Sequence, residues 1–230
     1  MRRFLPFAIS FCSVFVIAEL PVNVDLLFVG TYRRGAIEAS SGETWFGVYS
    51  TGDGFRLLRS KILVEQLRHD NPDLPFTVRV TADQQRVPVF LVKGIPGLSD
   101  RPIPTIFSGK FFLPPFQTSI LQLTDSIRYG FQAKGTYREV AGAQGLYDYE
   151  LEFFQFPWKR SQMLATFRQI DLENPPSILW AGDLDNDGKL DFILELANHS
   201  GATQKTLYLS SMAKGNDFVA EAAEFSHPDC

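Results

Sequence analysis

Short apolar or alternating segments, separated by turns rich in glycine, proline, asparagine and aspartate, recur along most of the chain. β-Branched and aromatic residues are frequent in these segments, which is typical of strands. The segments are residues 24–32, 44–49, 55–64, 76–80, 87–95, 105–113, 120–123, 136–140, 146–156, 162–170, 177–181, 192–196, 206–210 and 218–225. No segment combines a 3.6-residue apolar period with convincing helix caps. The pattern predicts an all-β fold of mainly antiparallel strands, either a sandwich or an incomplete barrel.

Two pairs of neighbouring segments have the spacing of β-hairpins. Thr51-Gly-Asp-Gly54 is the predicted turn of the first pair, and residues 141–145 are the predicted turn of the second. In the strand predicted at residues 146–156, alternate side chains should point to the same face. The apolar face would carry Tyr147, Tyr149, Leu151 and Phe153, and the polar face Asp148, Glu150 and Glu152.

Composition and length narrow the fold further. The chain has 230 residues, with 21 Phe, 14 Pro and 17 Gly, which favours many short strands joined by turns over long helices. This length suits one all-β domain, which we place at residues 19–230. The sequence lacks a G-x-S-x-G elbow, an H-E-x-x-H motif and a phosphate-binding P-loop. No common catalytic class is therefore indicated by a motif.

The N-terminus has the pattern of a secretory signal peptide. Arginines at positions 2 and 3 precede an apolar stretch at residues 4–17, and the compact residues that follow allow cleavage after Ala18. The stretch is too short to span a bilayer comfortably. We therefore predict that residues 1–18 are a signal peptide and that the mature chain is periplasmic or secreted, without insertion into a membrane.

Charge and cysteine content bear on partners and stabilisation. Removal of residues 1–18 leaves 20 basic and 26 acidic side chains, a formal charge of −6. An acidic chain without a basic patch argues against nucleic acid as a partner. Only Cys230 remains after cleavage, so it is either incidental or pairs between chains. Because no disulfide can form within the mature chain, a bound ion would be a useful source of stability.

One acidic stretch carries the clearest chemistry. From Asp183 to Asp191 the sequence reads Asp-Leu-Asp-Asn-Asp-Gly-Lys-Leu-Asp, with carboxylates at relative positions 1, 3, 5 and 9 and glycine at position 6. This is the front half of a calcium loop, in which the glycine allows a sharp bend. An all-oxygen ligand set suits Ca²⁺ and suits zinc or copper poorly. The predicted ligands are Asp183, Asp185, Asp187, Asp191 and the carbonyl of Lys189.

The flanks of this loop differ from those of an EF-hand. Position 12, where an EF-hand has its bidentate glutamate, is Leu194, and Glu195 follows one residue late. Residues 177–181 and 192–196 are short apolar runs, which indicates a strand–loop–strand arrangement.

The predicted ligand set is nearly complete, and no general base lies beside it in the sequence. A structural ion is therefore expected, rather than a catalytic one.

The strand–loop–strand pattern D-x-D-x-D-G-x-x-D resembles the calcium loops of FG-GAP and VCBS repeats, as in integrin α-chain propellers. The run from Trp180 to Phe192 is also similar to a run in secreted bacterial proteins. The resemblance implies that the ion lies in the loop and connects two adjacent strands. It assigns the ligands to the same five residues, and it makes a propeller-like fragment the alternative fold.

The remaining candidates for chemistry are weaker. The histidines at positions 69, 199 and 227 fall in predicted loops, and His69 with Asp70 and Asp73 is a weak metal or acid–base group. Trp158 could stack on a sugar if it were exposed, and Glu150 with Glu152 could be a glycosidase pair. Solvated loops explain the histidines equally well, and burial in the core explains Trp158. A solvent-exposed strand face explains Glu150 and Glu152.

The sequence therefore predicts an exported calcium-binding β protein with a non-enzymatic binding or structural role, whose partner is a protein or a glycan. The alternative is a calcium-dependent hydrolase that acts on glycans or lipids. A third possibility is an acidic turn without an ion, because aspartate, asparagine and glycine favour turns in any case.

Overall fold

The computed structural model describes residues 23–67, 77–140, 143–157, 160–172, 174–199 and 201–228. Within these ranges every strand pair is antiparallel, and no helix is long and apolar enough to cross a membrane. The predicted signal peptide, His69, Asp70, Asp73, Trp158 and Cys230 lie outside the described residues.

The described strands form three sheets. The upper sheet has the order β1 (Asp25–Leu27), β6 (Phe90–Lys93), β3 (Thr44–Thr51), β4 (Gly54–Leu67), β5 (Thr77–Ala82) and β2 (Gly30–Arg33), and β7 (Arg101–Pro102) also pairs with β4. The central sheet has the order β16 (Ala220–Pro228), β15 (Ala202–Leu209), β14 (Asp191–Glu195), β13 (Ser177–Gly182) and β8 (Thr105–Phe112). The lower sheet has the order β12 (Ser161–Asp171), β11 (Ala143–Gln155), β10 (Arg128–Val140) and β9 (Thr118–Gln122).

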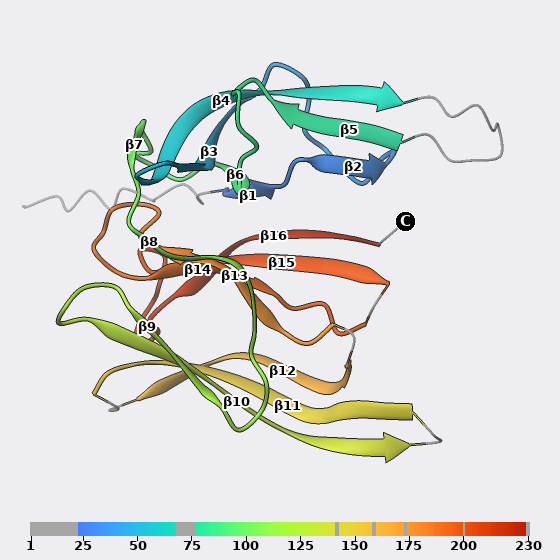
Figure 1. The fold of residues 1–230 in the computed structure, drawn as a ribbon, viewed down its shortest axis with the longest axis vertical. Helices are drawn as coiled ribbons and strands as arrows, with labels where there is room; N and C mark the ends of the chain where they lie inside the picture. Colours follow the sequence, from blue (N-terminus) through green and yellow to red (C-terminus); the bar gives the residue numbers. More distant parts are fainter. Residues whose placement is uncertain are drawn as a thin grey trace, which may run out of the picture.

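The three sheets stack as layers, with the central sheet between the other two (Figure 1). Two cores result. The upper core joins the upper and central sheets, and in it the rings of Phe90 and Trp180 lie 5.2 Å apart. The lower core joins the central and lower sheets, and in it Phe192 contacts Phe131 with ring centroids 4.9 Å apart. The predicted antiparallel all-β fold is confirmed, and its sandwich has three layers.

Burial on both faces explains the apolar runs of the central sheet. Every residue of β14 is buried. Ile193 faces the upper core, whereas Phe192 and Leu194 face the lower core. A strand that is covered on both faces needs apolar side chains on both, so it loses the alternation of a half-exposed strand. The loop that β13 and β14 enclose is therefore held by two strands that are almost entirely buried.

Both predicted hairpins are present. Thr51 pairs with Gly54 at the end of β3 and β4, and Val140 pairs with Ala143 at the end of β10 and β11. The second turn is thus shorter than predicted. The strands around it are longer, because β10 already begins at Arg128.

The predicted apolar face of β11 is wrong at Tyr147. Asp148 has a positive φ of 50°, and the pairing of β10 with β11 shifts register between Lys134 and Thr136, as at a β-bulge. The bulge interrupts the alternation, so Leu146 and Tyr149 are both buried. Tyr147 is half-buried, with the Arg138 guanidinium 5.6 Å above its ring.

Candidate metal centre

The acidic loop closes the hairpin between β13 and β14, as predicted from its apolar flanks. The hairpin pairing ends where Gly182 lies opposite Asp191. On the other side, β13 pairs with β8, and the Asp183 N–H donates to the Pro104 carbonyl across 2.8 Å. A Cβ at Gly182 would lie 2.3 Å from that same carbonyl oxygen. Glycine is therefore required where the chain enters the loop.

Two leucines fix the loop to opposite cores. Leu184 is fully buried in the upper core, and Leu190 is buried in the lower core. Polar contacts follow the same division. Arg101 from β7 donates to the Leu184 carbonyl, and Tyr129 from β10 is hydrogen-bonded to the Leu190 backbone. The loop is thus connected to all three sheets.

Three carboxylates converge in this loop. One oxygen from each of Asp183, Asp185 and Asp187 lies within 4.8 Å of the others. The backbone curls through left-handed conformations at Asn186 (φ 68°) and Gly188 (φ 79°), two residue types that tolerate positive φ. The bend that was predicted at Gly188 is confirmed. We call these three aspartates the acidic triad.

Backbone N–H groups hold one oxygen of each triad carboxylate. Gly188 N donates to Asp183 Oδ2 across 3.1 Å, and Asp187 N donates to Asp185 Oδ1 across 3.2 Å. Lys189 N donates to Asp187 Oδ1 across 2.8 Å. These bonds within the loop orient the side chains toward its interior.

Two serines outside the predicted ligand set also contact the triad. Ser210 Oγ donates to Asp187 Oδ2 across 2.8 Å, and Ser211 Oγ donates to Asp185 Oδ2. Both follow β15, which pairs antiparallel with β14 and so ends beside the acidic loop. The available signal was the polar Ser-Ser pair directly after an apolar strand next to the predicted calcium hairpin.

Asp191 has a different position from the triad. It is fully buried, and its Oδ2 accepts the Leu184 N–H across 2.8 Å. Its Oδ1 accepts the Ser210 N–H across 2.8 Å and lies 3.0 Å from Ser210 Oγ. Burial raises the pKa of Asp191 to about 8, helped by the charge of Asp185 and opposed by these hydrogen bonds. Asp191 therefore accepts hydrogen bonds both from Leu184 in the acidic loop and from Ser210 after β15. Its role as an ion ligand stays a prediction.

Lys189 contributes through its backbone and its charge. Its N–H binds Asp187, and its Nζ lies 3.9 Å from Asp187 Oδ2, with the side chain 60% exposed. Such an exposed pair offsets little of the repulsion among the carboxylates. The predicted contact between the Lys189 carbonyl and an ion stays a prediction.

One carboxylate oxygen of the triad is buried without a hydrogen-bond partner among the described residues, which suits the binding of a cation. Asp183 is only 6% exposed, and its Oδ1 is buried without a hydrogen-bond partner in the described structure. Burial raises the pKa of Asp183, and the charges of Asp187 and Asp185 raise it further, against the N–H bonds of Gly188 and Asn186. A buried carboxylate oxygen without a donor needs a proton or a cation. The triad can therefore hold a metal ion.

The spacing of the triad also suits a large oxygen-coordinated ion. Calcium binds oxygens at about 2.3–2.6 Å, so two ligands on opposite sides of it are up to about 5 Å apart. The separation within the triad stays below that limit. All the ligand atoms are carboxylate oxygens, which are hard ligands and favour a hard cation over zinc or copper.

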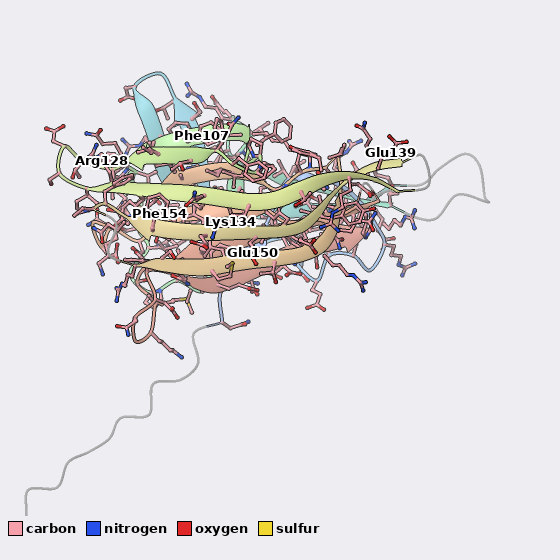
Figure 2. All side chains as sticks on the ribbon, turned by 90° about the horizontal axis from the view of Figure 1, so that it is seen from below. Phe107, Arg128, Lys134, Glu139, Glu150 and Phe154 are labelled. Carbon is pink, nitrogen blue, oxygen red and sulfur yellow. The ribbon has the colours of Figure 1, made fainter. Side chains whose placement is uncertain are left out.

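The other predicted candidates lie elsewhere. Glu152 accepts a hydrogen bond from Lys134 across 2.6 Å, and Glu150 is exposed, both on the outer face of the lower sheet, where Lys134 and Glu150 are labelled in Figure 2. His199 is exposed in a loop, as predicted. His227 was predicted in a loop but lies in β16, with its ring 5.2 Å from that of Tyr32.

Comparison of the chain with protein-family models, with curated proteins and with solved structures gives no match.

Proposed function

We propose that this is an exported calcium-binding β protein in which one Ca²⁺ stabilises the loop between β13 and β14, with a non-enzymatic binding or structural role. The observation that carries the proposal is the buried, unpartnered Oδ1 of Asp183 beside the carboxylates of Asp185 and Asp187. A divalent cation at this point would satisfy that oxygen and reduce the repulsion within the triad.

The position of the triad supports a structural ion. Leu184 and Leu190 tie the loop to the two cores, so an ion that rigidifies the loop would also limit the movement of the sheets around it. The same site resembles an FG-GAP or VCBS calcium loop in the order of its carboxylates and its glycine. In that resemblance, too, the ion connects neighbouring strands.

Export is supported by the sequence alone. The basic and apolar pattern of residues 1–18 is typical of a signal peptide, which supports a mature chain in the periplasm or outside the cell. Millimolar calcium is sufficient for extracellular modules whose dissociation constants are about 10⁻⁴–10⁻³ M. We propose a protein or a glycan as the partner.

Calorimetric titration tests the calcium site. Metal-free protein titrated with CaCl₂ should bind one ion per chain, and an excess of Mg²⁺ should compete weakly. Asp185→Asn should weaken binding at least tenfold, because it removes a ligand charge while its amide oxygen can still accept the Asp187 N–H. Asp53→Asn makes the same change in the turn between β3 and β4, at a carboxylate that accepts from the Thr51 hydroxyl and is not part of the acidic loop, and should leave binding unchanged. Absence of binding, or equal binding by both variants, would refute the proposal.

A further inference from the structure

A pocket of about 340 Å³ opens beside the acidic triad. Apolar side chains of Val24, Ile95, Leu209 and Met212 line most of it, and Asp185 and Asp187 lie in its polar part. A mainly apolar cavity with a few converging polar groups is typical of a small-molecule site, and this volume lies within the usual range.

The apolar part of the pocket is built between two layers. Val24 precedes β1 and Ile95 follows β6, both in the upper sheet, whereas Leu209 ends β15 of the central sheet. These three side chains are at most 8% exposed, so their positions are fixed by the upper core. Met212 packs against the same core and is half-buried, and its unbranched thioether can adapt to a bound chain.

The triad is asymmetric with respect to this pocket. Asp183 is buried and does not line it, while Asp185 and Asp187 do. Calcium takes six to eight oxygen ligands, and the five predicted ligands, with one oxygen each, leave at least one position open. An ion held by the triad would therefore direct open coordination positions toward the pocket, where water or the oxygens of a ligand can fill them.

Charge determines which ligand fits. Without an ion, the polar part of the pocket presents two carboxylates and would repel an anion. With Ca²⁺ bound, its two positive charges offset most of the charge of the three triad carboxylates, and the ion presents positive charge to the pocket. The most favourable contact for the open side of the ion is then an anionic oxygen.

We propose that this pocket binds an amphiphilic anion, whose carboxylate or phosphate oxygens complete the calcium coordination and whose alkyl chain lies on Val24, Ile95, Leu209 and Met212. The inference rests on the proposed calcium site. By thermodynamic linkage, a ligand that coordinates the ion increases the affinity of the protein for calcium. Bound calcium increases the affinity of the protein for the ligand by the same factor. A cationic amphiphile would instead compete with calcium for the carboxylates.

Calorimetric titrations of the full chain in saturating CaCl₂ and in EGTA test the inference. Octanoate and octyl phosphate are the probes, and the stronger of the two identifies the head group. We expect binding that is on the order of tenfold or more tighter with calcium than without it. Acetate, which has no chain, and octanol, which has no charge, should each bind more weakly than octanoate in calcium.

A matched pair of variants locates the alkyl chain. Met212→Gln should weaken octanoate binding about fivefold or more while calcium affinity without octanoate stays unchanged. Met163→Gln makes the same change at an exposed position of β12 outside the pocket and should have no effect.

Two results would overturn the inference and leave the calcium site standing. One is a protein that binds calcium but neither probe. The other is tighter binding of octyltrimethylammonium in EGTA than of octanoate in calcium. Failure to bind calcium at all, which the calcium titration reports separately, would remove the proposed function and this inference together.

Discussion

The hydroxyl oxygen of Ser210 lies 2.8 Å from Oδ2 of Asp187 and joins the end of β15 to the acidic loop. The two residues are 23 positions apart in the sequence. Because Ser210 also donates its backbone N–H to Asp191, it contacts both the triad and the buried carboxylate behind it. The site is therefore a product of three strands, β13, β14 and β15, rather than of the loop alone.

Ser210→Ala should lower the free energy of unfolding by about 1.5–3 kcal/mol in EGTA, the range for a lost hydrogen bond to a charged group. Urea denaturation measures the change. Ser211→Ala is the control, since Ser211 is exposed and bonds only Asp185, whereas Ser210 is buried and bonds both Asp187 and Asp191, so the loss should be less than about 1 kcal/mol. Equal losses in the two variants would contradict the role assigned to Ser210.

Asp191→Ala should destabilise the metal-free protein far more than Asp185→Ala. The first change leaves the buried N–H groups of Leu184 and Ser210 without an acceptor, at about 1–3 kcal/mol each. Asp185 is partly exposed, so water can replace its carboxylate. Urea denaturation in EGTA separates the two, and a similar loss for both would show that Asp191 is not the acceptor that connects the site.

Gly182 and Gly188 should respond differently to the same substitutions. Alanine at Gly182 places its Cβ against the Pro104 carbonyl and the Trp180 ring, which should cost about 3 kcal/mol or more. Alanine at Gly188 has free space, and the positive φ there should cost only about 1–2 kcal/mol.

Asparagine discriminates between these two causes. It tolerates left-handed conformations, so Gly188→Asn should recover most of the stability that Gly188→Ala loses. Gly182→Asn should recover none, because its Cβ meets the same carbonyl. Thermal unfolding measures the recovery. Recovery at both glycines would exclude the close contact with the Pro104 carbonyl as the reason why position 182 requires glycine.

Glu195 gives the protein a defined pH dependence. Burial raises its pKa above the usual value, against hydrogen bonds from Gln204 and Ala197 and the charge of Lys205. The folded state therefore holds this proton more tightly than the unfolded state. The stability it contributes is fully present below the unfolded pKa of about 4.3 and is lost as pH rises through the folded pKa.

Glu195→Gln removes this titration, so its unfolding free energy should improve relative to the wild type as pH rises from 4 to 8 in EGTA. Glu152→Gln should change in the opposite direction. The hydrogen bond from Lys134 lowers the pKa of Glu152, so the wild type gains stability from that carboxylate as pH rises from the folded pKa to above the unfolded value of about 4.3, and the measurements for this variant start well below pH 4. The same sign for both variants would contradict the burial assigned to Glu195.

The strands and the acidic loop could be predicted from the sequence because both depend on local patterns. The loop follows from the spacing of Asp183, Asp185, Asp187 and Gly188, and the strands beside it follow from short apolar runs that end in turns. The three layers could not be predicted this way. Ile193 and Phe192 are neighbours in an apolar run, and only the packing of distant strands assigns them to different cores.

The contacts of the site beyond the loop also depend on the fold. Ser210 reaches Asp187 because β15 pairs with β14, a register that no local pattern specifies. The same applies to the pocket, which combines Val24 and Ile95 from the upper sheet with Leu209 from the central sheet. The error at Tyr147 has a local cause, since one residue in a left-handed conformation, Asp148, shifts the alternation of the strand.

The most direct test of the calcium site is the unfolding temperature of the wild type and of Asp185→Ala in 10 mM CaCl₂, in MgCl₂ and in EGTA. A dissociation constant of about 10⁻⁴–10⁻³ M implies about 1.4–2.7 kcal/mol of added stability in calcium, or about 3–10 °C. We predict this increase for the wild type in calcium, a smaller one in magnesium, and at most about half of it for Asp185→Ala, because a site at least tenfold weaker adds at most about 1.4 kcal/mol. Equal unfolding temperatures of the wild type in calcium and in EGTA, or an equal increase in the variant, would contradict the account.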